Sequence, residues 1–269
     1  MIIARLLAFA ALWFSITATA ATLRVCADPN NLPFSNRAQQ GFENRIAQRL
    51  AHDLHRRLVY TWWAQRRGFA RNTVKADHCD LWVGVAAGVQ TLDTTTPYYR
   101  SSYVFVTRAD RNLDISSFDD PRLRDLVVGV QMIGNDATNT PPAHALARRG
   151  MTANVRGYMV YGDYAQEDPQ APIVRAVADR QVDIAIIWGP LAGYFAKHSR
   201  IPLRMDPVQP QSDGAMLPMV FDIAVGVRHG DSELKSAIER ALVRQRASIE
   251  RILDDYNVPR VPKIALAAE

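Results

Sequence analysis

Short apolar runs alternate with amphipathic helical patterns along this chain, and the alternation begins twice. The first series opens with Leu23–Ala27, and a helix follows in which apolar residues recur every four positions from Phe42. Runs rich in β-branched and aromatic residues then appear at 58–63 and 81–85. Strands that alternate with helices at this spacing are typical of parallel sheets, because a crossover helix returns the chain to the same end of the sheet. We therefore expect a βαβαβ unit here.

The alternation restarts after the polar stretch 108–120, and this second start predicts a second lobe. A strand at 221–227 and two amphipathic helices after Asp231 indicate that the chain then returns to the first lobe. The expected fold class is α/β, with two lobes that are each a parallel-rich sheet flanked by helices, and a cleft between the lobes. In the second series, strands and helices are expected at 126–130, 141–149, 155–161, 172–180 and 183–188. The predicted lobe boundaries are 21–107 plus 218–269 for lobe one and 108–217 for lobe two.

The first 20 residues have the pattern of a signal peptide. Arg5 is their only charge, the apolar run 6–16 follows it, and Ala18–Ala20 fits the small-residue rule of signal peptidase. A membrane anchor is the alternative, but a span of the ~30 Å hydrocarbon core needs about 20 apolar residues. We expect export to the periplasm, cleavage near Ala20, and a mature chain that does not insert into the membrane.

Composition and charge are those of a globular protein with a mildly basic surface. Hydrophobic residues make up 48% and charged residues 22%, and the net charge is +5. The densest basic group, Arg66, Arg67 and Arg71, lies near Trp62 and Trp63, which could stack on bases. An exported protein rarely meets nucleic acid, so a solvated helix face is the better interpretation. We expect no nucleic-acid partner.

Cys26 and Cys79 are the two cysteines of the chain. In an oxidising compartment such a pair predicts one disulfide, which would stabilise the fold by roughly 4 kcal/mol in the chain-entropy model. The alternative is a metal site that uses His78 and Cys79, but the chain has no second ligand pair at suitable spacing. A structural disulfide is favoured and no metal site is predicted.

The order of elements resembles the type II periplasmic binding proteins. The run 221–234 is similar to the strand and helix by which that family returns to lobe one, and 249–259 is similar to its closing helix. Val128–Gln131 looks like the first strand of its second lobe. The resemblance covers nearly the whole chain after residue 20, and it implies two lobes around a ligand cleft.

A narrower resemblance lies in Cys26–Asn36, followed by Gly41–Asn44, and in Thr96–Val106. These segments resemble the J proteins of methanol dehydrogenase clusters, MxaJ or XoxJ. The resemblance implies an accessory protein that assists maturation or activation of a periplasmic pyrroloquinoline-quinone-dependent methanol dehydrogenase, which would be its partner. The alternative is a receptor of an ABC importer with a small-molecule or peptide ligand. A third possibility is an enzyme like the dehydratases related to binding proteins.

Two departures argue against a receptor for amino acids. Amino-acid-binding relatives hold the ligand carboxylate with an arginine between the third strand and the Pro-Tyr loop, and Gly88–Thr94 has none. They also place an aspartate after the late strand of lobe two, where this chain has Trp188-Gly189-Pro190. Any solute bound here is expected to be something other than an amino acid.

Ligands of open α/β sheets bind beyond the carboxyl ends of the strands, and this rule selects an aromatic and amide-rich set of cleft residues. Turn formation is an equally good explanation for Asp28 and Asn30, and core packing is the alternative for Tyr98, Tyr99 and Trp188. Tyr99 and Arg100 are the expected anchors for the dehydrogenase. The expected cleft residues are Asp28, Asn30, Asn31, Phe34, Tyr98, Tyr99, Arg100, Asn135, Asp136, Thr138, Asn139 and Trp188.

The sequence offers no constellation typical of catalysis. Among the histidines only His52 and His55 are expected on one helix face, opposite the apolar residues. The nucleophile elbow Gly-x-Ser-x-Gly, the zinc motif HExxH and a phosphate-binding loop are absent from the sequence. We therefore expect a binding protein that needs no cofactor and performs no reaction.

Overall fold

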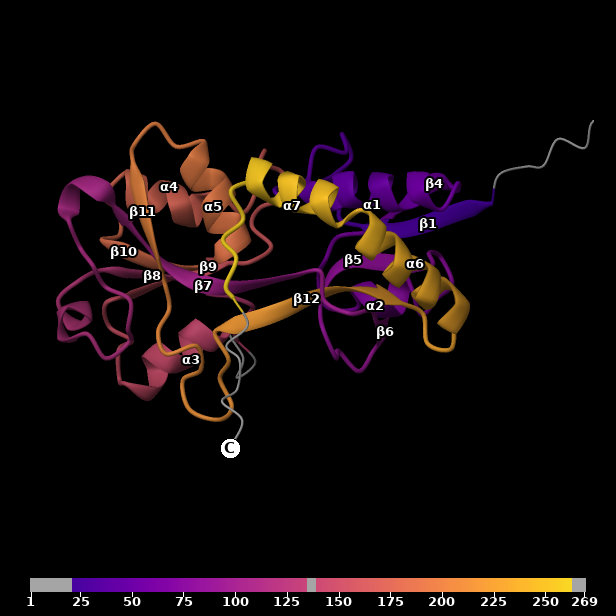
Figure 1. The fold of residues 1–269 in the computed structure, drawn as a ribbon. Helices are drawn as coiled ribbons and strands as arrows, with labels where there is room; N and C mark the ends of the chain where they lie inside the picture. The colour runs from indigo at the N-terminus through magenta and orange to yellow at the C-terminus, as the bar shows by residue number, and fades with distance from the viewer. Residues whose placement is uncertain (1–20, 135–138, 263–269) are drawn as a thin grey trace, which may run out of the picture.

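Two long strands, β7 (Tyr99–Arg108) and β12 (Val220–Val227), run between two α/β lobes (Figure 1). The computed structural model describes residues 21–134 and 139–262, so the predicted signal peptide lies outside the described residues. Strand β7 pairs with β12 through 99–102 and with β10 (Ile184–Trp188) through 103–107. Strand β7 therefore belongs to the sheets of both lobes. The lobe boundaries at 107 and 218 remain a prediction.

Lobe one is a sheet in the order β4-β1-β5-β12. Strand β1 pairs in parallel with β4 and with β5, as the βαβ pattern predicted, whereas β12 is antiparallel to β5. Helices α1, α6 and α7 pack on this sheet (Figure 1). The elements of this lobe are β1 (Thr22–Ala27), β2 (Asn30–Asn31), β3 (Ser35–Asn36), α1 (Phe42–Asp53), β4 (Arg57–Trp62), α2 (Phe69–Asn72), β5 (Leu81–Ala86), β6 (Asp93–Thr94), α6 (Ser232–Arg244) and α7 (Arg246–Asp255).

Lobe two continues from β7 in the order β10-β8-β9, with β11 on the other side of β7. Strands β8, β9 and β10 are parallel to one another, and β7 is antiparallel to both β10 and β11. The elements of this lobe are the 3-10 helices η1 (Ala109–Arg111) and η2 (Pro121–Arg124), β8 (Val128–Met132), α3 (Pro141–Arg148), β9 (Val155–Met159), α4 (Pro172–Ala178), α5 (Gly189–Lys197) and β11 (Leu203–Pro207).

The apolar periodicity read from the sequence coincides with the core of lobe one. Phe42, Ile46 and Leu50 of α1 have no exposed surface. The predicted fold class is confirmed, with helix α5 and strand β11 as additions that the sequence pattern did not indicate. Helix α5 is too uniformly apolar to show an amphipathic period, because both lobe two and the closing helix cover it.

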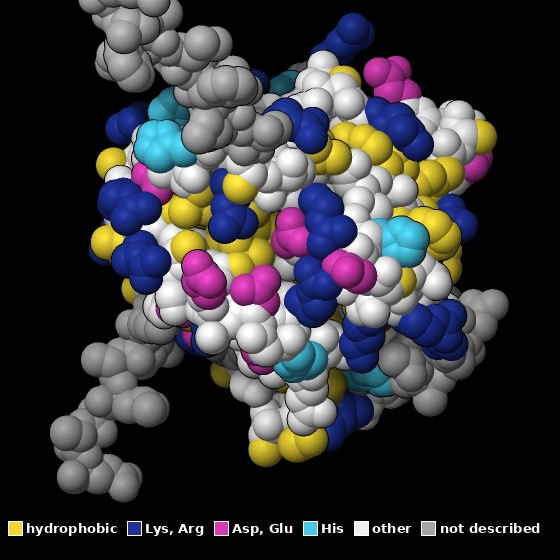
Figure 2. All heavy atoms as spheres, turned by 90° about the vertical axis from the view of Figure 1, so that its right-hand side faces the viewer, with side chains coloured by type: hydrophobic (Ala, Val, Ile, Leu, Met, Phe, Trp, Pro, Cys, Tyr) yellow, Lys and Arg dark blue, Asp and Glu magenta, His cyan; other side chains and the backbone are white. Residues whose placement is uncertain are grey.

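The outer end of lobe one carries charges of both signs. Figure 2 shows lysine and arginine side chains dispersed among acidic and apolar ones on this face, with no continuous basic area. Charged residues of lobe one also pair with one another, for example Arg244 with Asp53 at 2.5 Å. Within 21–134 and 139–262, no helix is both long and apolar enough to cross a bilayer.

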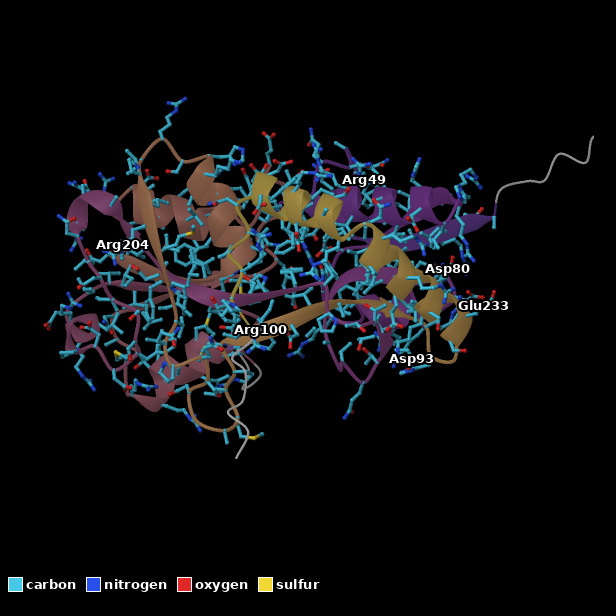
Figure 3. All side chains as sticks on the ribbon, in the orientation of Figure 1. Arg49, Asp80, Asp93, Arg100, Arg204 and Glu233 are labelled. Carbon is cyan, nitrogen blue, oxygen red and sulfur yellow. A yellow bond between two sulfur atoms is a disulfide. The ribbon has the colours of Figure 1, made fainter. Side chains whose placement is uncertain are left out.

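The C-terminal segment is a third connection between the lobes. Tyr256, at the end of α7, packs on Phe42 of lobe one at 5.8 Å and on Tyr194 of lobe two at 5.6 Å between ring centroids. The chain then runs across β7, where Val261 donates to the backbone oxygen of Arg100 at 3.0 Å and Ser101 donates to that of Pro259 at 2.6 Å. Figure 3 shows Arg100 at this junction beside β12.

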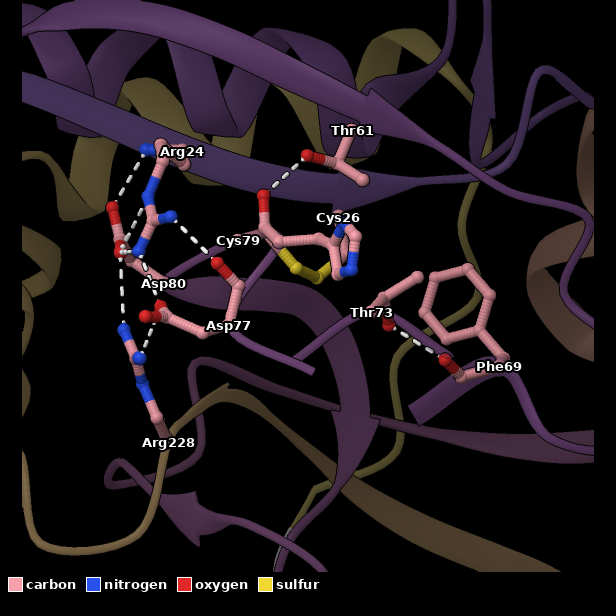
Figure 4. The surroundings of a disulfide bond; sticks show 10 residues. Arg24, Cys26, Thr61, Phe69, Thr73, Asp77, Cys79, Asp80 and Arg228 are labelled. Atoms are coloured by element: carbon pink, nitrogen blue, oxygen red, sulfur yellow. Dashed lines mark hydrogen bonds and ion pairs between the residues drawn. A yellow bond between two sulfur atoms is a disulfide. The ribbon is translucent and has the colours of Figure 1, made fainter. Parts of the chain in front are cut away.

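The predicted disulfide between Cys26 and Cys79 is confirmed (Figure 4). The two Cα atoms are 5.6 Å apart, and both side chains are buried. The bond ties β1 to the loop that precedes β5. In the same loop, Asp80 binds the backbone nitrogen and the guanidinium of Arg24, both at 2.9 Å. Both contacts fix the loop before β5 against β1.

Candidate functional site

A cavity of about 400 Å³ lies between the lobes at the carboxyl ends of β1, β5, β8 and β10. This is the position that the topology of open α/β sheets predicts for a ligand. Lobe one supplies loop residues after β1, the first turn of α1 and the end of β5, and the connecting strands supply aromatic rings. Lobe two supplies the ends of β8 and β10 and the segment 160–170.

Asp28 follows β1, and its carboxylate accepts from three donors. The backbone nitrogen of Asn30 donates to Oδ1 at 2.8 Å, and that of Gln65 donates to Oδ2 at 2.6 Å. The hydroxyl of Tyr164, in lobe two, donates to the same Oδ2. The residue is only 2% exposed, so these charge-assisted bonds replace its hydration. Asp28 both shapes its own turn and ties the two lobes together.

Further polar contacts cross the cleft beside Asp28. The amide nitrogen of Asn30 donates to the backbone oxygen of Gln166 at 3.1 Å, and the side chain of Gln170 donates to Oδ1 of Asn31. The guanidinium of Arg66 lies 4.5 Å from the ring centre of Tyr164, within cation–π range. The segment 160–170 therefore closes over lobe one, and the structure is that of closed lobes.

The N-terminal turn of α1 is fixed against the loop that precedes it. A Cβ on Gly41 would lie 2.0 Å from the backbone oxygen of Phe34, so only glycine fits there. The side-chain oxygen of Asn44 accepts from the nitrogens of Gly41 at 3.2 Å and Asn36 at 3.1 Å. These contacts place the third residue of the turn, Glu43, in the wall of the cavity.

Glu43 is an acidic group with no hydrogen-bond donor among the described residues. Its carboxyl lies over Gly84 of β5, where a Cβ would be 1.8 Å from Oε1. Protein shields it from bulk water, and the surface that it retains faces the cavity. Burial, and secondly the charge of Asp28, raise the pKa of Glu43 well above its usual range.

Aromatic rings form the apolar part of the lining. Trp188, at the end of β10, contacts Tyr103 at 5.4 Å and Phe221 at 5.8 Å between ring centroids. Its backbone nitrogen donates to Oε1 of Gln131 at 2.8 Å, which fixes that amide in the wall. The rings of Tyr99 and Phe34 face the cavity from lobe one.

Six of the residues predicted from the sequence lie at this site. Asp28, Asn31, Phe34, Tyr99 and Trp188 line the cavity, and Asn30 makes the cross-lobe bond beside it. The structure therefore brings residues from β1, β7 and β10 together. Asp28 both forms the turn after β1 and lines the cavity, so the two explanations considered for it are compatible.

Three further predicted residues lie elsewhere. Tyr98 packs in the lobe-one core and lines a groove beside α6 and α7. Arg100 contacts Asp222 and Gln211 at 3.4 and 3.3 Å. Asn139 receives bonds from Ile133 and Thr140 before α3, next to a separate surface pocket. Asn135, Asp136 and Thr138 lie outside the described residues.

Several lining residues were not predicted from the sequence. Glu43 lies within Gly41–Asn44, a segment that entered the sequence analysis only through the family resemblance, and helix amphipathicity would assign it to solvent. Tyr164 and Gln170 lie in a loop without periodicity, so nothing local marks them. The residues of this group are Glu43, Gln65, Tyr103, Gln131, Tyr161, Tyr164, Gln170 and Phe221.

The charge of the cavity follows from these residues. Asp28 and Glu43 line it, and no lysine, arginine or histidine among the described residues does. A ligand carboxylate would therefore meet two acidic groups and no guanidinium, which agrees with the missing arginine at 88–94. Within the described chain, no group of three or more His, Cys, Asp or Glu side chains is placed to hold a metal ion.

Comparison with known proteins agrees with this geometry. Residues 23–258 match the model of the bacterial extracellular solute-binding proteins, family 3. The chain is 35% identical to protein MoxJ of Methylorubrum extorquens over 250 residues, which is 90% of this chain and 83% of MoxJ.

Two solved structures share the architecture. One is the periplasmic binding protein XoxJ from Methylobacterium extorquens AM1, with 35% identity, a TM-score of 0.74 and coverage of 90% of this chain and all of XoxJ. The other is MxaJ from Methlophaga aminisulfidivorans MPT, with 28% identity, the same TM-score and coverage of 89% of this chain and all of MxaJ. The chain belongs to family 3 of the bacterial extracellular solute-binding proteins and, within it, to the J proteins represented by MoxJ, MxaJ and XoxJ.

Proposed function

We propose that this protein is a periplasmic accessory protein of methanol oxidation, which assists maturation or activation of a pyrroloquinoline-quinone-dependent methanol dehydrogenase by binding its polypeptide. The similarity to MoxJ, MxaJ and XoxJ over most of the chain carries the proposal. The pattern of residues 1–20 supports export. The cavity supports a binding role, because most of its wall consists of aromatic and amide side chains around the carboxyls of Asp28 and Glu43.

The rim of the cleft offers two exposed apolar side chains as anchors for a partner. Trp63 follows β4, and its nitrogen donates to the oxygen of Ala27, next to Asp28. Met159 ends β9 directly before Val160, which lines the cavity from lobe two. Each is 47% exposed, although exposed large apolar residues are uncommon on this protein. Tryptophan and methionine are enriched in protein interfaces, so these residues suit a protein partner.

Tyr99 and Arg100, the anchors expected from the sequence, are poor reporters of binding. Tyr99 is 7% exposed and packs edge-on against Phe42, so its truncation would also disturb the lobe-one core. Arg100 is held by Asp222 and Gln211 at the junction of the lobes (Figure 3). Trp63 and Met159 are each 47% exposed, so their truncation should disturb the core less than truncation of Tyr99.

The experiment measures binding of the purified mature protein to the dehydrogenase, in its apo and holo forms, by biolayer interferometry. Trp63→Ala and Met159→Ala should each weaken the complex by more than about 1 kcal/mol, roughly fivefold or more in Kd. Met216→Ala is the matched control, because Met216 is 80% exposed and lies away from the cavity lining. Absence of binding to both forms of the dehydrogenase would refute the proposal.

A receptor for an importer is the second candidate, and the cavity of about 400 Å³ between the lobes is the observation that favours it. A solute that binds only the folded state raises the melting temperature. We expect no shift with the common amino acids, since the cavity lacks a basic group for their carboxylate. A clear shift with one of them, together with no binding of the dehydrogenase, would favour the importer function.

A further inference from the structure

The cavity contains one acidic group whose charge nothing in the described structure balances. Glu43 faces the cavity, and neither a side chain nor a backbone nitrogen of the described residues donates to its carboxyl. Enclosing an unpaired carboxylate costs several kcal/mol, and such groups in proteins are commonly explained by an absent ligand or a function. Without a cation beside it, Glu43 avoids this cost by retaining a proton, because burial raises its pKa, and a bound cation would allow it to ionise.

Asp28, the other acidic group of the cavity, already has hydrogen-bond partners within the protein. Asp28 already accepts bonds from Asn30, Gln65 and Tyr164. Its charge nevertheless adds to the negative potential at Glu43, which is why it contributes to the raised pKa of that residue. The cavity thus has one open carboxyl acceptor in a field that attracts a cation.

Three phenol side chains lie close enough to Glu43 for its charge to affect them. Burial raises the pKa values of Tyr98 and Tyr99 well above the usual range and that of Tyr60 to about 12, and the carboxyl of Glu43 contributes to each. The hydroxyl of Tyr98 is buried and has no partner among the described residues, and that of Tyr60 donates to the backbone oxygen of Asn44. None of the three rings supplies a positive charge.

The remaining walls suit the hydrocarbon part of a cationic ligand. Tyr103, Tyr161, Trp188 and Phe221 line the cavity, and the faces of aromatic rings attract cations as well as alkyl groups. Gly84 makes room for the Glu43 carboxyl at the cavity wall, because any Cβ there would collide with it. A volume of about 400 Å³ admits a short alkyl chain with its head group.

We propose that the cavity binds an alkylammonium group, with Glu43 as the counter-ion and the aromatic walls around the alkyl chain. Two sources can present this chemistry, the lysine side chain of a bound polypeptide or a free primary amine. The lysine source rests on the proposed function, whereas the free amine does not. Carboxylate ligands are disfavoured by the same charges.

Binding should be coupled to the release of a proton. In the empty cavity, burial and Asp28 raise the pKa of Glu43, so its carboxyl retains a proton at pH values where an exposed glutamate is ionised. An ammonium beside it favours the ionised form and lowers that pKa. Affinity should therefore rise with pH below the pKa of Glu43 in the empty protein.

Isothermal titration of the mature protein tests this inference with two matched pairs of probes. Butylammonium is compared with 1-butanol, and N-acetyl-lysine N-methylamide with its norleucine counterpart, which lacks the amine. We expect the cation of at least one pair to bind at least tenfold more tightly than its neutral partner. The observed heat should depend on the ionisation enthalpy of the buffer, because a proton is released.

Glu43→Gln should weaken that cation at least tenfold, whereas Glu233→Gln should leave it unchanged, because Glu233 lies at the outer end of α6 (Figure 3). Glu43→Asp keeps the charge and serves as a second variant if the glutamine variant does not fold. Equal affinity for cation and neutral partner, no cation binding at all, or undiminished binding by both Glu43 variants overturns the inference. Dehydrogenase binding measured on the same samples distinguishes failure of this inference from failure of the proposed function.

Discussion

The hydroxyl of Tyr164 in lobe two donates a hydrogen bond to the carboxylate of Asp28 in lobe one. Asp28 also accepts from two backbone nitrogens of lobe one, so the bond joins a rigid turn to the segment 160–170. Arg66 lies over the Tyr164 ring and holds the same segment from the other side. Tyr164 and its neighbours therefore make the main contacts that hold the two lobes together across the cleft.

Tyr164→Phe should shift the protein toward an open arrangement of the lobes. Hydrogen bonds to charged groups contribute about 1.5–3 kcal/mol, so the ratio of closed to open molecules should fall roughly tenfold or more. Small-angle X-ray scattering should show a larger radius of gyration. Tyr161→Phe is the control, because its hydroxyl lines the same cavity and has no hydrogen bond among the described residues. Equal scattering from all three proteins would show that this bond does not hold the lobes.

Without added ligand, Glu43→Gln should become more stable than wild type as the pH rises. The pKa of Glu43 is raised in the folded state, chiefly by burial and further by Asp28, so its stabilising contribution is complete below the unfolded value near 4.5. That contribution is lost as the pH rises through the folded pKa, at about 1.4 kcal/mol per unit of difference. The neighbouring phenols, Tyr60, Tyr98 and Tyr99, have raised pKa values and stay neutral over this range.

Urea unfolding at pH 4.5, 6 and 8 measures this difference. The free energies of unfolding of wild type and Glu43→Gln should be similar at pH 4.5 and should separate at higher pH, with the variant the more stable. Glu233→Gln should follow wild type throughout. A Glu43→Gln variant that is less stable than wild type at pH 8 would show that a favourable interaction stabilises the Glu43 carboxylate in the folded protein.

Gly84→Ala should destabilise the protein more than Gly88→Ala. Both glycines have positive φ, +82° and +78°, so alanine at either position costs about 1–2 kcal/mol in backbone strain. At Gly84 the new Cβ would also displace the Glu43 carboxyl, whereas nothing lies within 4 Å of the one at Gly88. Chemical denaturation of both variants, repeated in a Glu43→Ala background, isolates this collision. The excess should disappear when Glu43 is alanine, and its persistence would contradict the contact between the Glu43 carboxyl and Gly84.

Loss of the disulfide should cost about 4 kcal/mol of unfolding free energy, because Cys26 and Cys79 are 53 positions apart and their bond restricts the unfolded chain. The double variant Cys26→Ala/Cys79→Ala and reduced wild type should unfold at similarly lower urea concentrations. A thiol assay on unreduced, denatured protein should find no free thiol. Two free thiols in protein from the periplasm would contradict the bond.

The sequence by itself determined the fold and part of the site, because both follow from local patterns of apolar and polar residues. The four-residue spacing of Phe42, Ile46 and Leu50 fixes the buried face of α1, and alternating strands and helices require parallel sheets. Asp28 could be placed in the cleft because it directly follows a strand, and strand ends meet at one edge. The disulfide could be predicted because the chain contains two cysteines, so each has one possible partner.

Only the tertiary structure decided the chemistry of the cavity. Glu43 has the local sequence of a solvent-facing helix residue, and it is enclosed because Gly84 and Asp28 are brought against it by pairing of β1 with β5. Tyr164 and Gln170 lie in an irregular loop, where no period constrains which side chain meets lobe one. Periodicity reports which face of an element is buried against its own lobe. Contacts across a cleft depend on how two lobes are oriented, and no local pattern encodes that orientation.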